Sequence, residues 1–151
     1  MVVIEYQIFP MTYDDAKEIS SWRYEEYYSI YNIPFFEKIY SPPLYGEVEF
    51  YSIFKNEELY GHFRVKNFSN FTLLGLAFKP KYCGQGLGTS NMNLILSFLK
   101  EHGVKKIRLN VRDTNARAKK CYINVGFTPV GMEVMNVNNT PTDFMVMEKE
   151  L

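Results

Sequence analysis

The segment from Leu76 to Thr89 combines an apolar strand-like run, a glycine-rich turn and the start of a helix. Gly84, Gly86 and Gly88 fall close together, and glycine accepts positive φ and lets a ligand approach the backbone. The first N–H groups of the helix, and the positive end of its dipole, then face the turn. Such a turn can bind a phosphate or a pyrophosphate. On its own the signal is weak, because an isolated pattern of this kind is more typical of an ordinary tight turn from strand to helix. The spacing matches neither a Walker loop nor a dinucleotide fingerprint.

A second group of residues follows a predicted strand further along the chain. Asn115, Ala118 and Tyr122 stand at positions i, i+3 and i+7 of a predicted helix that Gly126 ends. Residues at this spacing share one helix face. An amide, a small side chain and a phenol therefore line the same side of this helix, where the phenol can donate a proton.

The elements that must position these residues follow from apolar periodicity. Alternating apolar, β-branched and aromatic residues predict strands at 2–9, 48–54, 59–65, 71–78, 106–111, 127–137 and 143–150. Caps, periodicity and glycine stops predict helices from Thr12 to about Tyr28, in a short piece beginning at Pro34, through 92–99 to Gly103, and at 115–125. The turns between the second, third and fourth strands fall at 55–58 and 67–70.

The order P-x-Y-x-G-x-G-x-G-T, helix, strand, then N-x-x-A-x-x-x-Y-x-x-x-G-F resembles the GNAT superfamily of acetyl-CoA-dependent N-acetyltransferases. The resemblance covers residues 71–150 well and the amino-terminal part more loosely. It implies an α/β (α+β) fold: a mixed, mostly antiparallel sheet of six to seven strands, flanked by about four helices and splayed between the fourth and fifth strands. It also implies that acetyl-CoA enters the gap at the splay.

The resemblance assigns roles to individual residues. The backbone of Leu76, Ala77 and Phe78 would pair with the pantetheine arm, and an N–H at or near Phe78 would serve the oxyanion. Asn115 would bond the arm or neighbouring backbone, Ala118 would let the cosubstrate lie close, and Tyr122 would protonate the departing thiolate. The pyrophosphate would be bound by the loop residues Cys83, Gly84, Gln85, Gly86, Leu87, Gly88 and Thr89. No metal site is predicted.

Cys83 stands where the family usually has Arg or Gln. With Cys83, the chain lacks the longer side chain that helps to fix the loop in the family. We still expect the loop to bind the pyrophosphate, because the main donors are backbone N–H groups. A thiol near a helix N-terminus can also have a lowered pKa, which raises the alternative of covalent catalysis. Direct transfer to the amine, as in the family, is the preferred interpretation over that alternative.

The acceptor and the general base stay open. Candidates for the base are Glu47, Glu49, His62 or water. Nine aromatic residues crowd residues 22–45, and they either pack or, beside Glu25 and Glu26, bind a cationic amine. The branch that acetylates a ribosomal protein's amino-terminal alanine typically has Glu at the position of Asn110, which argues against that particular substrate.

Charge and composition limit the function classes. The chain has 151 residues, 46% of them hydrophobic, which suits one domain over 1–151, and its 17 basic residues balance its 17 acidic ones. We therefore expect no nucleic-acid partner. The absence of a membrane-length apolar run and the presence of only two cysteines favour a cytoplasmic protein without a membrane partner. The predicted partners are acetyl-CoA and an amine acceptor, and a homodimer stays possible.

The balance hides an asymmetry. Residues 1–60 carry eleven acids and four bases, a net charge of −7, so the rest of the chain carries +7. Eight bases lie between Lys100 and Lys120, where they form either a solvated face or an anion site. In the second case Lys119 or Lys120 would meet the 3′-phosphate of CoA.

Two further functions compete with acetyl transfer from acetyl-CoA to a primary amine of a small molecule or peptide. One is a catalytically inactive CoA-binding sensor or interaction module, which Cys83 and the missing base favour and Tyr122 disfavours. The other is acetylation of protein amino termini. Transfer of acetyl to any amine in a panel distinguishes the first of these from an enzyme.

Overall fold

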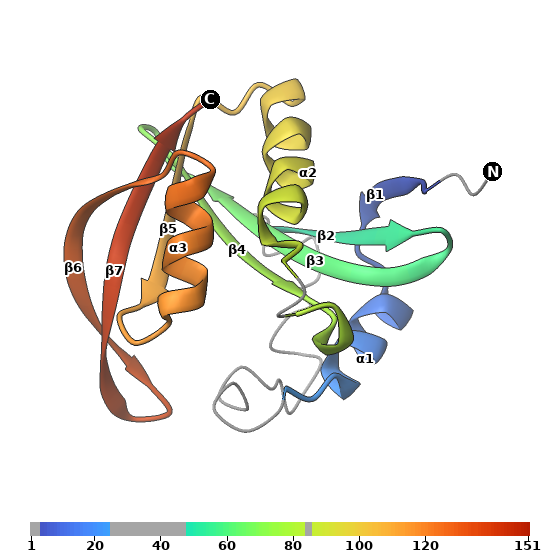
Figure 1. Cartoon of the computed structure of the whole chain (residues 1–151), viewed down its shortest axis with the longest axis horizontal. Coiled ribbons are helices and arrows are strands. Elements are labelled where there is room, and N and C mark those ends of the chain that lie inside the picture. Colours follow the sequence, from blue (N-terminus) through green and yellow to red (C-terminus); the bar gives the residue numbers. More distant parts are fainter. Residues whose placement is uncertain (1–3, 25–47, 84–85) are drawn as a thin grey trace. The chain divides into compact units, whose positions relative to one another are not determined.

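The computed structural model describes residues 4–24, 48–83 and 86–151, and its elements are labelled in Figure 1. The chain divides into two compact units. Unit 1 contains residues 1–66 and 76–83, and unit 2 contains residues 67–75 and 84–151. The division cuts the fourth strand, so the beginning of that strand belongs to unit 2 and its end to unit 1. The single domain expected over 1–151 stays a prediction.

Unit 1 is built on an antiparallel meander of β1 (Tyr6–Pro10), β2 (Val48–Lys55) and β3 (Glu58–Asn67). The predicted turn between β2 and β3 is present, and its two central residues, Asn56 and Glu57, both have positive φ, at 48° and 72°. Two such residues make the tight turn whose twist suits a β-hairpin. The register places Ser52 opposite His62 and contains an irregularity between Ile53 and Phe54.

Helix α1 (Tyr13–Ser21) covers one face of this meander. Thr12 caps it as predicted, in a capping box with Asp15. Its apolar side buries Ala16, Ile19 and Trp22 in a cluster with Met11 and Leu59. The predicted helical extension to Tyr28 is wrong, because the chain turns extended at Trp22, with ψ at 137°. The short helical piece expected from Pro34 lies outside the described residues.

Unit 2 contains β5 (Lys106–Arg112), β6 (Thr128–Val137) and β7 (Thr140–Glu150), with β7 between the other two. Asn138 and Asn139 both have positive φ and form a tight turn between β6 and β7. For this reason β7 begins at Thr140, three residues earlier than predicted. The β6 strand lies at one edge of the sheet, has a bulge between Pro129 and Gly131, and exposes Val130, Met132 and Val134.

Helices α2 (Gly88–Glu101) and α3 (Ala116–Asn124) belong to unit 2 and contact each other. The apolar residues predicted for α2 are its buried ones, among them Met92, Ile95 and Leu99. Gly103, with φ at 84°, follows α2 as the predicted C-cap glycine, and Gly126, with φ at 101°, ends α3.

Strand β4 (Thr72–Phe78) completes the sheet, whose hydrogen-bonded order is β1-β2-β3-β4-β5-β7-β6. Strands β4 and β5 are parallel neighbours, and their described register pairs Thr72 with Ile107 and Leu73 with Arg108. This short pairing agrees with the predicted splay between the fourth and fifth strands. The seven-stranded mixed sheet is confirmed, with three α-helices in the described residues where about four were expected.

Candidate functional site

The predicted anion-binding turn leads into α2. Gly86 has φ at 73°, a conformation that residues with a Cβ rarely adopt, and the space around it is open. Leu87 is the N-cap residue and makes no side-chain hydrogen bond to the helix. The first intrahelical hydrogen bond runs from Asn91 N to Leu87 O, at 2.9 Å. Gly84 and Gln85 lie outside the described residues.

The start of α2 is therefore suited to an anion. The N–H groups of Gly88, Thr89 and Ser90 precede the first intrahelical bond, and no capping side chain satisfies this helix end. The first turn carries no acidic residue, and these three residues are exposed. By contrast, side chains cap both α1 and α3. A phosphate group supplies what this helix end lacks.

Gly88 also fixes the contact between α2 and α3. A Cβ at this position would lie 2.8 Å from Cys121 Sγ, which is closer than real Cβ atoms approach. The glycine thus lets the start of α2 lie directly against α3. Burial raises the pKa of the Cys121 thiol, so this cysteine acts as an apolar contact.

Helix α3 carries the other predicted residues of unit 2. Asn115 is its N-cap, and its Oδ1 accepts a hydrogen bond from Ala118 N at 3.1 Å. This is the neighbouring-backbone contact named as one alternative for Asn115. Tyr122 is half-buried, its ring centroid lies 5.9 Å from that of Phe127, and its carbonyl accepts from Phe127 N. The turn at Gly126 thus helps to hold the Tyr122 backbone.

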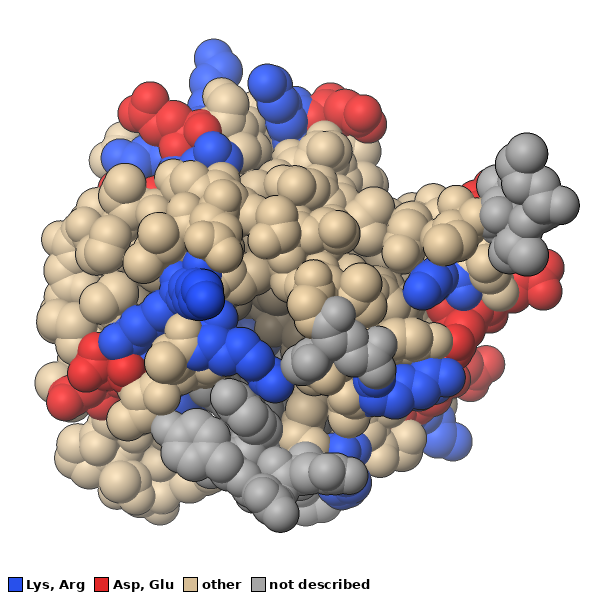
Figure 2. Space-filling model, viewed as in Figure 1, with Lys and Arg blue, Asp and Glu red and all other residues tan. Residues whose placement is uncertain are grey.

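Some bases of the predicted basic cluster form ion pairs with acidic residues, and others do not. Lys119 Nζ lies 2.7 Å from Asp113 Oδ1, whereas Lys120 is exposed. Glu148 pairs with Lys106 and with Arg108, and these bases lower the pKa of its carboxyl. In Figure 2 basic and acidic side chains stand beside one another along the upper edge of the view. Lys120 therefore fits a 3′-phosphate role better than Lys119 does.

The predicted pantetheine strand ends in unit 1. Gly61 of β3 lies against its last residues, since a Cβ on Gly61 would come within 2.5 Å of the Phe78 ring and 3.1 Å of the Ala77 carbonyl oxygen. The carbonyl of Phe78 accepts hydrogen bonds from Tyr24 Oη, at 2.7 Å, and from Cys83 Sγ, at 3.6 Å. Tyr24 was predicted only as one of the crowded aromatics. Leu76, like Ala77 and Phe78, is half-buried.

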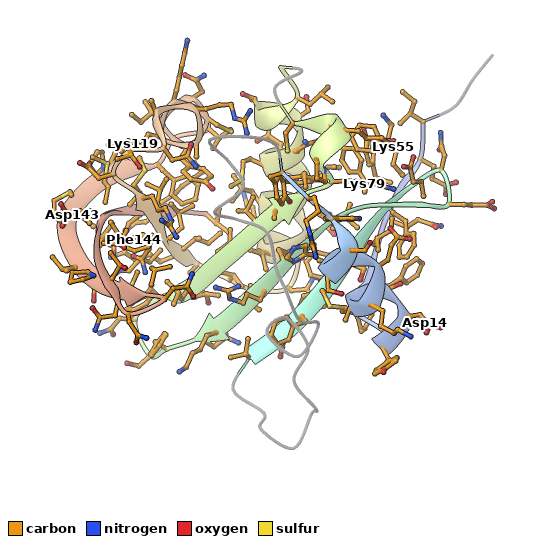
Figure 3. The ribbon with its side chains drawn as sticks, turned by 90° about the horizontal axis from the view of Figure 1, so that it is seen from below. Asp14, Lys55, Lys79, Lys119, Asp143 and Phe144 are labelled. Atoms are coloured by element: carbon orange, nitrogen blue, oxygen red, sulfur yellow. The ribbon has the colours of Figure 1, made fainter. Side chains whose placement is uncertain are left out.

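Sequence reasoning missed a second cluster beside this strand. Glu58 accepts hydrogen bonds from Tyr82 Oη at 2.5 Å and Lys79 Nζ at 3.2 Å, and it forms an ion pair with Lys81 at 2.7 Å. Figure 3 labels Lys79 and Lys55, and the Nζ of Lys55 lies over the Tyr82 ring. Lys81 and then Tyr82 lower the pKa of Glu58 to about 2. The cluster anchors the short 3₁₀ helix η4 (Pro80–Tyr82) that leads to Cys83. In the sequence, only the predicted turn at 55–58 pointed to this Glu58 cluster.

The described candidates for the general base have different surroundings. Glu49 is exposed and accepts a hydrogen bond from Tyr51 Oη at 2.7 Å. His62 is buried, and burial first, then the charge of Arg64, lowers its pKa to about 4. It is therefore neutral at pH 7. Glu47 lies outside the described residues.

These observations define an α/β protein with a splayed mixed sheet, an uncapped helix start after a glycine turn, and a tyrosine on the helix packed against it. The sequence matches the family model described as "Acetyltransferase (GNAT) family" over residues 13–127. The chain belongs to this family, whose members are acetyl-CoA-dependent N-acetyltransferases.

Solved structures give the same fold. A chimera of the spermidine N-acetyltransferase SpeG from Vibrio cholerae and hSSAT has 19% identity and a TM-score of 0.78, covering 95% of this chain and 93% of that one. The spermidine N-acetyltransferase from Vibrio cholerae in complex with CoA and spermine has 18% identity and a TM-score of 0.72, covering 96% and 95%. The ribosomal-protein-S18-alanine N-acetyltransferase from Escherichia coli has 19% identity and a TM-score of 0.69, covering 97% and 94%.

No curated protein matches the chain in sequence. Within residues 4–24, 48–83 and 86–151, no group of three or more His, Cys, Asp or Glu side chains is arranged to hold a metal ion. No helix in this described part is both long enough and apolar enough to span a membrane.

Proposed function

We propose that this enzyme transfers the acetyl group of acetyl-CoA directly to a primary amine of a small molecule or a peptide. The observation that carries the proposal is the uncapped, acid-free start of the 14-residue helix α2, directly after the positive φ of Gly86. Family membership supplies the cosubstrate that fits this helix end. Acetyl-CoA brings the activated thioester, and the protein binds and orients it.

Different residues of the chain bind different parts of acetyl-CoA. The N–H groups of Gly88 and Thr89 bind the pyrophosphate, and the loop residues Gly84, Gln85, Gly86 and Leu87 are proposed to contribute to the same site. The backbone of Leu76, Ala77 and Phe78 pairs with the pantetheine arm, and Ala118 leaves space for it. Asn115 holds the beginning of α3, and Cys83 holds the loop through the Phe78 carbonyl.

The chemical step needs a neutral amine, a donor for the carbonyl oxygen and a proton for the leaving thiolate. The amine nitrogen forms a bond to the acetyl carbon while the carbon–sulfur bond breaks. An N–H at or near Phe78 stabilises the charge on the oxygen. Tyr122 gives its proton to the sulfur, and the proton lost by the amine passes to water or to a base, which completes the balance.

Two measurements test this function. CoA and acetyl-CoA should raise the melting temperature with dose, because each binds the native state. Release of free thiol from acetyl-CoA should then follow addition of at least one amine from a panel of polyamines, aminoglycosides, amino acids and peptides. A thermal shift without transfer to any amine would favour the inactive CoA-binding module. The absence of any shift at saturating CoA would contradict the proposal.

A further inference from the structure

Among the described residues of unit 1, two buried ring nitrogens have no hydrogen-bond partner. They are Nε1 of Trp22, at the end of α1, and Nε2 of His62, on β3. Each residue is only 6% exposed, and the ring centroids lie 6.0 Å apart with 45° between the planes. Buried polar atoms nearly always have a partner. A neighbouring pair of unsatisfied ones therefore indicates a binding group that the described residues do not supply.

The polar side chains recorded around this pair are already engaged. Ser52 lies directly opposite His62 on β2, but its Oγ donates to Asp15 Oδ2 at 2.9 Å. The same Asp15 oxygen also accepts from Thr12 N. This hydroxyl and this carboxylate are therefore engaged in the capping box of α1. Neither is recorded as a partner of the Trp22 or His62 nitrogen.

The chemistry of the two nitrogens selects that partner. An indole N–H only donates, so it needs an acceptor atom, while the neutral imidazole nitrogen either donates or accepts. Arg64, two residues along β3, lies on the same face as His62 and adds positive charge. An ammonium group has no lone pair to offer Trp22 and is repelled by Arg64. An oxygen of a carboxylate or carbonyl group suits all three residues.

The position of the pair connects it with the reaction. His62 follows Gly61, the residue that lies against Ala77 and Phe78 of β4. This end of β4 is the segment proposed to hold the pantetheine arm. The His62 side chain, one residue further along, leaves β3 on the opposite face, so a group bound there would lie one strand away from the proposed pantetheine segment.

Resting on the proposed function, we propose that Trp22 Nε1 and His62 Nε2 bind an oxygen of the acceptor, which is an amine with a neighbouring carboxylate or carbonyl, as in an amino acid or a peptide. Arg64 strengthens the preference for a carboxylate. Polyamines, which carry only ammonium groups, are poor acceptors for this arrangement. The inference narrows the acceptor class without altering the roles given to Tyr122 and α2.

The sole tryptophan of the chain provides a direct test. In the ¹⁵N-labelled full chain saturated with CoA, it gives a single indole N–H resonance. We would titrate this resonance with the twenty amino acids, a set of dipeptides, L-lysinamide, 1,5-diaminopentane and spermidine. At least one amino acid or dipeptide should shift the resonance saturably, and the two polyamines should not. A resonance unmoved by every oxygen-bearing compound, or moved most by a polyamine, would overturn the proposal.

Two variants extend the test to turnover. Trp22→Phe keeps an aromatic ring but removes the N–H, and His62→Phe removes the second nitrogen. Each should raise KM for the oxygen-bearing acceptor by about tenfold and leave KM for acetyl-CoA within about twofold. His102→Phe is the matched control, because the other histidine of the chain is exposed at the end of α2.

The outcomes separate the two proposals. Variants that retain the thermal shift with CoA are folded and bind the cosubstrate, so a change in acceptor KM alone supports the acceptor site. An unchanged acceptor KM in both folded variants would mean that an ordered water satisfies the two nitrogens, and would overturn the inference. If CoA did not raise the melting temperature of the parent chain, the proposed function would be contradicted. The indole titration would still report on the acceptor site.

Discussion

Tyr122 is the single side chain on which the proposed chemistry depends most. It lies on α3, half-buried, and its backbone carbonyl is held by the N–H of Phe127 in the turn that ends the helix. The other interpretation is a tyrosine that only packs, as its ring contact with Phe127 allows. The two interpretations differ in what the hydroxyl contributes to the rate.

Replacing Tyr122 by Phe should distinguish them. As the general acid, the hydroxyl should contribute on the order of 10²-fold to kcat, while affinity for CoA stays nearly intact. Steady-state kinetics with any accepted amine at saturation measures the change. A kcat within about threefold of the parent, under roughly 1 kcal/mol in barrier, would end the assignment.

Glu58 gives a second prediction at this scale. Its pKa falls from 4.5 to about 2 in the folded chain, chiefly through Lys81 and Tyr82. Its contribution to stability is therefore present above pH 4.5 and is lost as the pH falls toward 2. Glu58→Gln should lower the melting temperature near pH 7 and flatten its decline between pH 5 and pH 2. Melting curves across this range decide, and equal declines in parent and variant would contradict the role of the cluster.

At the scale of elements, the start of α2 combines a residue of positive φ, an N-cap without a side-chain bond and a close contact with α3. Each property suits the proposed binding of a bulky anion near the backbone. Gly86 offers the clearest test, since the other end of the same helix has a matched glycine, Gly103. Both have positive φ and open space around the α-carbon.

Gly86→Leu should abolish the thermal shift produced by CoA, because the new side chain would occupy the place of the pyrophosphate. Gly103→Leu imposes a similar backbone strain, about 1 kcal/mol, and should leave the shift in place. Differential scanning fluorimetry with and without CoA compares the two. An equal loss in both variants would assign the effect to strain.

The helices and strands also show which features could be predicted from the sequence. Caps and turns at Thr12, Asn56 and Gly103 were predictable because each depends on a few neighbouring residues. The end of α1 was missed, since the residues after Ser21 have ordinary helix propensity and no Gly or Pro marks the break at Trp22. The Glu58 cluster and the bond from Tyr24 to Phe78 join residues 21 to 54 positions apart. No local pattern contains such contacts.

For the site, the glycine turn and the α3 face followed from motifs, whereas the pairing of Trp22 with His62 did not. Those residues meet only because α1 packs across β2 and β3. Periodicity predicts that a helix has an apolar face, but it does not predict which strand residue each side chain meets.

Over the whole molecule, the charge divides between −7 in residues 1–60 and +7 in the rest. Pairing with Asp113 and Glu148 occupies several of the bases between Lys100 and Lys120. Lys120 stays exposed on α3. Lys120 is therefore the residue through which we expect the positive charge to act on a phosphate.

If this excess serves CoA, affinity should fall with rising salt, and dephospho-CoA should bind more weakly with a shallower salt dependence. Lys120→Gln should reduce the difference in Kd between CoA and dephospho-CoA by a few-fold. The exposed Lys100, changed to Gln, serves as the control. Calorimetric titrations at several salt concentrations measure how Kd depends on salt for each ligand. Equal dependence for CoA and dephospho-CoA would refute a role of the positive charge in binding the 3′-phosphate.

The edge strand β6 has a consequence for the molecule in concentrated solution. Its apolar side chains Val130, Met132 and Val134 are exposed at the edge of the sheet that the described strands form, a combination that promotes aggregation between copies. Pro129 offers no N–H to a neighbouring strand, and the bulge beside it bends the ladder. Both features hinder regular extension of the sheet by another copy along the first half of β6.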